Sequence, residues 1–326
     1  MSPLKRREFG QLAAATLTST VIADFCSKAL AQKTELSREI LYEINLPSSS
    51  NVENRENQAP SVELITTDLA KGNVISRINQ PELSVDNPLS APKISRAFYI
   101  ADSNRITKAI VLRDKTLLIS TVSSTRSGYF NYLISAVASG TISKFTARKV
   151  LGLEKGNQTI ESLLSLPNNQ LLCLLGNEGI PPFTFRTLDI TTGKILSGDE
   201  LNLPPLPLRH RFANLCQDRK GNIFATEITS EGIPILISMN LEEKAQITGK
   251  VKIKRLTPLS FEGRSLSNDL KDLNFSPSGQ LYAVAADNSE KNNIKEKNNA
   301  LFTVDVKSGK MGLVRKFAAE KFAFSL

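Results

Sequence analysis

The chain of 326 residues contains no tryptophan, three cysteines and one histidine, His210. A zinc site of the usual Cys/His kind needs about four such ligands, so the sequence predicts no metal site. A Ser-His-Asp or Cys-His centre would have to use His210 as its base. That residue stands between Arg209 and Arg211, whose charges disfavour a protonated imidazole. We therefore assign no catalytic residue.

Glycine-rich loops and long apolar runs are also missing. The 17 glycines stand singly, mostly in turn-like surroundings, so no phosphate-binding loop or dinucleotide fingerprint is present. After residue 31 no stretch reaches the ~20 apolar residues that a membrane-spanning helix needs. These absences argue against a nucleotide-dependent enzyme and against a transmembrane segment in the mature chain.

The N-terminus carries the clearest motif. Residues 5–9 read KRREF and lead into a mildly apolar segment that is too short to span a bilayer. The motif resembles twin-arginine export signals, with Arg6, Arg7 and Phe9 at matching positions. The glycine and glutamine that follow Phe9 depart from the family pattern. The resemblance implies export in the folded state by the twin-arginine machinery.

A cleavage site is expected directly after this segment, at Ala29-Leu30-Ala31. Residues 1–31 are then a removable signal and residues 32–326 the mature domain. The expected location is the periplasm, or the thylakoid lumen if the source is photosynthetic. The route is used both by proteins that load a cofactor before export and by fast-folding chains. The signal therefore does not decide whether this protein has a cofactor.

The charge balance is strongly basic, with a formal net charge of +9 and a pI near 9.4. In an exported protein this excess fits solubility, or contact with an unknown protein or an anionic envelope component such as a polymer or lipid headgroup. We expect no nucleic-acid partner.

The signal removes one cysteine and leaves Cys173 and Cys216 in the mature chain. In an oxidising compartment these two could form a disulfide, and they could equally remain buried thiols.

Two kinds of turn alternate along the chain between short apolar runs. The residues are Gly, Asn, Asp, Ser and Lys, which suit hairpins flanked by strands. The first kind stands at residues 113–116, 167–170, 218–221 and 276–279, and the second at 68–73, 137–140, 191–194, 242–244 and 307–310.

Each pair of turns indicates four antiparallel strands, and five such units are visible. A repeated four-stranded unit is typical of a β-propeller blade, because each small sheet buries its faces against its neighbours. The prediction is an all-β propeller of five to seven blades. Residues 80–106 and 255–269 are the places where a further blade could lie.

The chain ends on an apolar stretch, residues 321–326, with no partner strand of its own. We expect it to join the sheet of residues 62–78, which would complete the first blade and close the ring.

Three second-kind turns share a pattern, with sequences LDITTGK at 188–194, VDVKSGK at 304–310 and TDLAKGN at 67–73. The pattern resembles the blade repeat of quinoprotein-like bacterial propellers. That family usually continues into a tryptophan, whereas here Ile195, Met311 and Val74 stand near that place, which argues against a quinone-dependent enzyme. Asp and Gly in these motifs are expected to stabilise the turn itself.

The remaining candidate is Arg209-His210-Arg211, which precedes an apolar run and would lie where an inner strand begins. Such a cluster could bind an anion at the mouth of the central channel, or could be a solvated loop. The sequence thus favours an exported, non-catalytic ligand- or protein-binding propeller. The alternative is an exported propeller enzyme, either a lyase or hydrolase or a cofactor-dependent redox enzyme.

Overall fold

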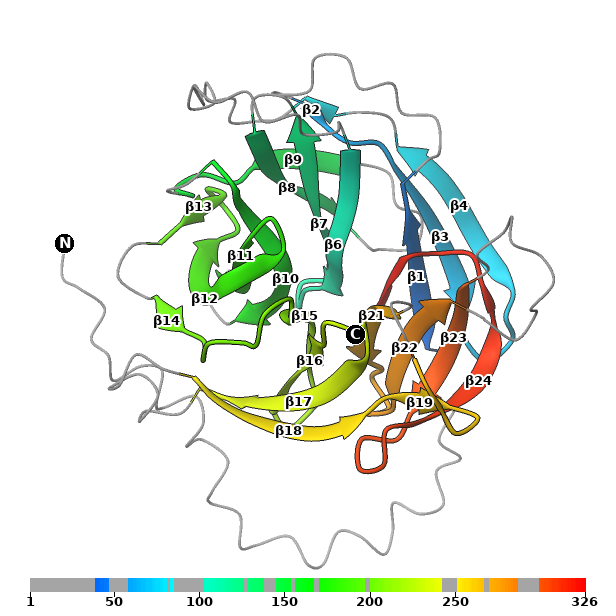
Figure 1. Ribbon diagram of the computed structural model, residues 1–326. Helices are drawn as coiled ribbons and strands as arrows, with labels where there is room; N and C mark the ends of the chain where they lie inside the picture. The colour runs from blue at the N-terminus through cyan, green and yellow to red at the C-terminus, as the bar shows by residue number, and fades with distance from the viewer. Residues whose placement is uncertain are drawn as a thin grey trace, which may run out of the picture.

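The computed structural model describes residues 39–46, 58–80, 83–84, 103–125, 128–137, 145–153, 156–166, 170–196, 200–241, 251–266, 270–286 and 299–326. The expected signal and cleavage residues lie outside these ranges. The described residues form five antiparallel sheets arranged in a ring (Figure 1). Among them no helix is long and apolar enough to cross a bilayer.

Each blade has four principal strands, and the innermost belongs to the ring around the axis. Blade 1 contains β25 (Lys321–Phe324), β1 (Ile40–Asn45), β3 (Val62–Asp68) and β4 (Val74–Gln80). Blade 2 contains β6 (Ser103–Val111), β7 (Thr116–Thr125), β8 (Gly128–Val137) and β9 (Phe145–Lys149).

The other three blades repeat this order. Blade 3 contains β10 (Gln158–Leu166), β11 (Gln170–Asn177), β12 (Ile180–Asp189) and β13 (Lys194–Ile195), with β14 (Leu201–Asn202) also paired to β12. Blade 4 contains β15 (Arg211–Gln217), β16 (Ile223–Ile228), β17 (Pro234–Asn240) and β18 (Lys252–Pro258). Blade 5 contains β21 (Leu270–Phe275), β22 (Leu281–Ala286), β23 (Asn299–Val304) and β24 (Lys310–Phe317).

The propeller prediction is confirmed, with five blades. Residues 255–269 do not hold another blade, because their described part forms the end of β18 and a small hairpin. This hairpin consists of β19 (Ser260–Phe261) and β20 (Arg264–Ser265) and extends the sheet of blade 5. A separate two-stranded sheet joins β2 (Gln58–Ala59) to β5 (Leu83–Ser84).

The Asp-Gly turns form as expected. Asp68, Asp189 and Asp305 each accept a backbone hydrogen bond from within their own turn, at 2.7–3.0 Å. Gly193 and Gly309 have φ near +70°, a conformation that a residue with a Cβ adopts only with strain. The hydrogen bonds from Ser308 also lower the pKa of Asp305. These carboxylates therefore serve the turns.

Five apolar clusters fill the spaces between successive blades. Aromatic pairs cross three of these spaces. Phe183 lies 5.6 Å from Phe212, and Phe224 lies 5.3 Å from Phe275, measured between ring centroids. In a chain without tryptophan, phenylalanine thus supplies much of the large apolar surface between blades. Of the three residues near the family's tryptophan position, Ile195 and Met311 are buried and Val74 is exposed.

The C-terminal strand closes the ring, as predicted, and it does so through a strand that sequence reasoning missed. β25 pairs with β1, with Phe324 opposite Leu41, and β1 in turn pairs with β3. The inner strands β25, β6, β10, β15 and β21 contact one another in that cyclic order. They surround the axis, and we call the end where these strands begin the entrance.

Candidate functional site at the entrance of the propeller axis

Four of the five inner strands, all except β25, have a break in the register of their pairing. Register shifts fall between Ile106 and Lys108, Ile160 and Ser162, Ala213 and Cys216, and Leu270 and Asp272. A β-bulge of this kind places an extra residue in one strand and re-aims its side chain. Four bulges at similar depth therefore direct a set of polar side chains toward the axis.

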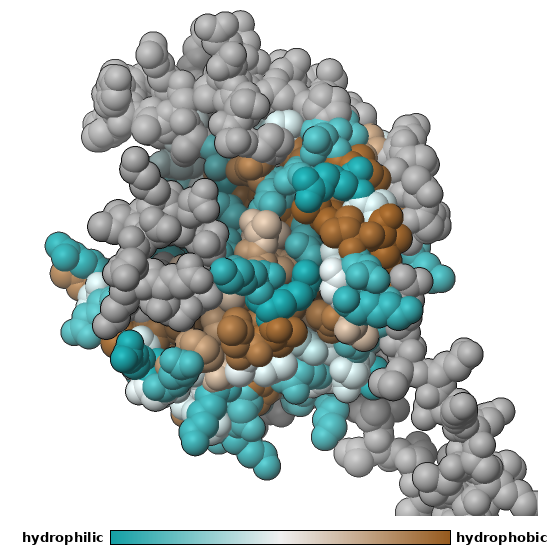
Figure 2. Space-filling model, turned by 90° about the vertical axis from the view of Figure 1, so that its right-hand side faces the viewer, coloured by the Kyte–Doolittle hydropathy of each residue, from teal (hydrophilic) through white to brown (hydrophobic). Residues whose placement is uncertain are grey.

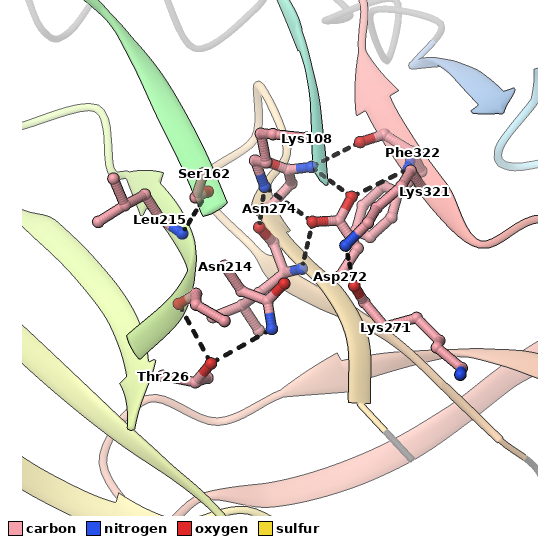
Figure 3. Close-up of polar contacts among 12 residues, drawn as sticks. Lys108, Ser162, Asn214, Leu215, Thr226, Lys271, Asp272, Asn274, Lys321 and Phe322 are labelled. Atoms are coloured by element: carbon pink, nitrogen blue, oxygen red, sulfur yellow. Dashed lines mark hydrogen bonds and ion pairs between the residues drawn. The ribbon is translucent and has the colours of Figure 1, made fainter. Parts of the chain in front are cut away.

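The deepest of these side chains form the axial network, which consists of Lys108, Asp272, Asn274 and Phe322 (Figure 3). Lys108 Nζ lies 2.9 Å from Asp272 Oδ1 and 2.7 Å from the Leu273 carbonyl oxygen. Asp272 Oδ2 accepts a bond of 3.0 Å from the Phe322 amide, and Asn274 Nδ2 donates to the Phe322 carbonyl at 2.6 Å. Blades 1, 2 and 5 are thus joined at the axis.

Solvent does not reach the charged pair of this network. The side chains of Lys108 and Asp272 are both 0% exposed, and Phe322 is fully buried. Charged groups so deep are stable only when they are paired and their other hydrogen bonds are satisfied, as here. A ligand that approaches from the entrance therefore meets a closed floor.

Above this floor, Arg105 on β6 reaches across to Glu161 on β10. The two guanidinium nitrogens lie 2.9 and 2.7 Å from the two carboxylate oxygens, which is the fork geometry of a strong ion pair. Thr159 also donates to Glu161. Glu161 is 5% exposed, whereas the Arg105 side chain is 41% exposed. The arginine therefore presents one side to solvent at the entrance.

Arg211, one of the three residues proposed from the sequence, begins β15 and faces the same region. Desolvation lowers the pKa of its guanidinium, the charge of Glu161 opposes that shift, and the charge of Arg105 adds to it. A guanidinium nevertheless stays protonated in proteins. Among the described residues, no hydrogen bond or ion pair engages the side chain of Arg211, so its guanidinium donors are available to a ligand.

Lys321 supplies a third cation, from β25. Its Nζ donates a hydrogen bond to the main-chain carbonyl of Lys271, as Figure 3 shows. Burial lowers the pKa of Lys321 to about 8, the charge of Asp272 opposes this shift, and the charge of Lys108 adds to it. The charge of Arg105 also contributes to this lowering, which links Lys321 to the same cationic region.

His210 and Arg209 have different surroundings from Arg211. His210 Nδ1 lies 2.8 Å from Glu227, whose carboxylate also binds Arg255 at 2.6 and 2.8 Å. Burial opposes ionisation of Glu227, but the hydrogen bonds from Arg255 and His210 prevail and lower its pKa. Arg209 is exposed in the preceding turn with φ of 64°. Only Arg211 of the three therefore remains a candidate for ligand contact.

The two cysteines are free thiols and both are buried. Cys173 packs between blades 2 and 3, whereas Cys216 packs between blades 4 and 5. Burial raises the pKa of the Cys216 thiol to about 12 and that of Cys173 further. The proposed disulfide is therefore not formed, and both residues act as small apolar core groups.

A cavity of about 230 Å³ lies elsewhere, between blades 2 and 3. Several of its polar groups already have partners. The Ser135 and Thr146 hydroxyls bond each other at 2.7 Å, Asp114 accepts from its own turn, and Arg148 donates to the Ile190 carbonyl. No cluster of metal-ligating side chains occurs in the described part of the chain. We therefore place the candidate site at the entrance.

Sequence reasoning missed Arg105, Glu161 and Lys321 at this site. One signal was available, because Arg105 precedes the turn residue Arg113 by the same spacing with which Arg211 precedes Arg219. The two arginines therefore occupy equivalent places on inner strands. No comparable signal marks Lys321, whose position depends on how the C-terminal strand closes the ring.

Comparison with models of protein families finds no match, and comparison with curated proteins finds no relative. Solved structures offer distant likenesses. A putative TolB from Agrobacterium tumefaciens is 13% identical with a TM-score of 0.40, covering 87% of this chain and 93% of its own. A protein of unknown function from Bacteroides caccae is 12% identical with a TM-score of 0.38, covering 89% and 99%.

A third solved structure is a calcium-binding protein, regucalcin, from Agrobacterium tumefaciens. It is 12% identical with a TM-score of 0.36 and covers 79% of this chain and 74% of its own. Likenesses of this strength carry no argument about ligand or activity. The functional conclusion must therefore come from the entrance residues themselves.

Proposed function

We propose that this protein is an exported β-propeller that binds an anionic ligand, or an anionic group of a partner, at the entrance of its axis. The observation that carries the proposal is the Arg105–Glu161 ion pair at the entrance, near the buried Lys108–Asp272 pair. The charge of Arg105 acts both on Arg211 of β15 and on Lys321 of β25, which places the two cations in reach of the same arginine. Glu161 neutralises part of this charge and fixes Arg105 in place. Because no side-chain partner engages Arg211 in the described residues, we propose that its guanidinium binds the incoming anion.

The proposed location supports this reading. Residues 1–31 are proposed to direct export through the twin-arginine machinery to the periplasm, or to the thylakoid lumen in a photosynthetic source. An anionic envelope component then becomes the proposed partner for a mature chain that keeps 37 basic and 30 acidic residues, a formal net charge of +7. We propose binding without catalysis, because the entrance carboxylate Glu161 is already engaged by Arg105 and Thr159.

The test compares two neighbouring arginines. Arg211→Ala should weaken binding of citrate and sulfate about ten-fold, because a charge-assisted hydrogen bond contributes about 1.5–3 kcal/mol. Arg209→Ala removes the same charge from an exposed turn and serves as the matched control. Titration calorimetry at low ionic strength measures both, since salt screens such contacts.

The proposal requires that Arg211→Ala lose more affinity for these anions than Arg209→Ala. Equal loss of affinity in both would show only a general effect of net charge. Unchanged affinity in Arg211→Ala, with normal thermal stability, would contradict the assignment of the entrance as the binding site.

A further inference from the structure

A proline-rich segment, residues 203–208, runs from β14 to the start of β15 and ends beside the entrance (Figure 1). Its sequence is LPPLPL, and residues 203–207 form neither strand nor turn. Proline fixes its own φ at about −65° and holds the residue before it in an extended conformation. The three prolines therefore favour a polyproline II helix.

The burial of this segment follows the same geometry. A polyproline II helix has about three residues per turn, so residues three apart share a face. Leu203 is buried between blades 3 and 4, and Leu206 packs against the same apolar cluster. Pro205 and Pro207 are exposed, and the Leu208 side chain is 86% exposed. One face of the segment is thus anchored in the core while the others are directed outward.

Both ends of the segment are held by backbone hydrogen bonds. The Leu203 amide donates to the Phe183 carbonyl at 3.2 Å, and the His210 amide donates to the Pro207 carbonyl at 3.0 Å. The second bond closes a turn in which Arg209 has φ of 64°. The segment is therefore formed before any partner arrives, and its binding requires little further ordering of the chain.

Exposure alone does not mark a docking surface. Apolar side chains are also exposed on the outer strands β4 and β24, on the side of the molecule that Figure 2 shows. Leu208 is more exposed than any other large apolar side chain of the described residues, and it continues a preformed proline-rich segment. The neighbouring Arg209 is exposed, and within the described ranges its side chain has no hydrogen bond or ion pair.

We infer that residues 203–208 are a docking surface for a protein domain whose groove is lined by aromatic side chains and carries a carboxylate at one end. Aromatic-lined grooves recognise polyproline II segments because these are already ordered and present proline rings outward. The charge of Arg209 complements the carboxylate. The inference goes beyond the proposed anion site and does not depend on it.

Titration with purified groove domains tests the inference. An SH3, a WW and an EVH1 domain are each titrated by calorimetry into the purified protein, and separately into a synthetic peptide of residues 201–211. We expect at least one domain to bind the protein. Leu208→Ser should weaken that binding about ten-fold, the scale expected for the loss of one leucine side chain from an interface.

Two further variants control the experiment. Leu313→Ser removes the same side chain from β24, where it is 52% exposed, and should leave the affinity unchanged. Pro205→Ala removes one outward ring and should weaken binding several-fold. Thermal melting checks that all variants are folded. The inference is overturned if the domains bind only the peptide, if they bind neither molecule, or if Leu208→Ser and Leu313→Ser have equal effects.

The same variants separate this inference from the proposed function. Leu208→Ser should leave the affinity for citrate and sulfate unchanged, and Arg211→Ala should leave the affinity for the groove domain unchanged. Loss of domain binding in Arg211→Ala as large as in Leu208→Ser would place the contact at the anion site and overturn the docking surface. Loss of anion binding in Arg211→Ala alone supports the proposed function.

Discussion

Two lysines near the axis, Lys108 and Lys321, show how strongly local surroundings decide the role of one residue type. Lys108 is fully buried and paired with Asp272, so its charge is compensated and serves the structure. The Lys321 side chain lies nearby but donates only to a carbonyl in the described residues, so Asp272 and Glu320 compensate its charge only in part. The role of Lys108 can therefore be tested by measuring the stability of the protein, and the role of Lys321 by measuring how anion binding changes with pH.

Replacing Lys108 by Met should destabilise the protein by about 3–5 kcal/mol, because Asp272 would remain buried without its counter-ion. Arg77→Met, which breaks an exposed pair with Glu63 at 3.6 Å, is the matched control and should cost about 0–1 kcal/mol. Urea unfolding measures both. Similar midpoints for the two variants would contradict a structural role for the axial network.

The double variant Lys108→Met with Asp272→Leu refines that test. Removing both charges leaves no unpaired ion, so much of the lost stability should return. If the double variant is as unstable as the single one, hydrogen bonds from Asp272 to Leu273 and Phe322 matter more than its charge pair.

Sulfate binding should weaken as pH rises through about 8. Below that pH Lys321 is protonated and attracts the anion, whereas above it the amine is neutral and only the arginines remain charged. Lys321→Arg stays charged over this range and should give a flat profile. Calorimetric titrations from about pH 6.5 to about pH 9, on either side of this pKa, measure the sulfate affinity of both proteins. A steep fall of affinity with pH in Lys321→Arg as well would assign the effect to another group.

At the scale of elements, closure of the ring depends on the antiparallel pairing of β1 with β25, which we call the clasp. β25 contributes Lys321 to the entrance and Phe322 to the axial network, while its backbone pairs with β1. Phe322 and Phe324 also pack between blades 5 and 1. One strand of four residues therefore links closure, core and candidate site.

Deleting residues 321–326 should abolish cooperative unfolding or lower the melting temperature by well over 10 °C, since several buried aromatic contacts are lost at about 3–5 kcal/mol each. Deleting Leu326 alone, which is 64% exposed, should change little. Differential scanning calorimetry distinguishes them. Equal melting curves for the two truncations would show that β25 does not close the ring.

At the scale of the whole molecule, the sequence revealed the architecture better than the site. Turn residues such as Asp189 and Gly309 repeat with the blades, so the repeated four-stranded unit followed from local chemistry. The expected turn at 242–244 and most of that at 137–140 lie outside the described residues. β1 escaped notice because its central residues are buried on both faces and show no alternation. The strand partner of the C-terminus was therefore missed, although its sheet was predicted.

The site depended on contacts that one sequence does not display. Arg211 was predicted because it precedes an inner strand, but the Lys108–Asp272 contact joins residues far apart in the chain. His210 was grouped with Arg211 because the two are adjacent in the sequence. In the structure β15 begins at Arg211, and the His210 side chain is hydrogen-bonded to Glu227. The closure of the ring determines which residues of different inner strands come together at the axis, and that closure involves all five blades.

The pairing of β1 with β25 also determines how the molecule responds to force. Ile40 and Ser325 are hydrogen-bonded at the end of this antiparallel pair where the two chain ends leave the ring. Tension applied between those ends loads the hydrogen bonds of the clasp one after another, in the manner of a zipper, instead of all together. The ring should thus open first at this seam under mechanical load, with each of blades 2 to 5 still held as a continuous hairpin-linked sheet.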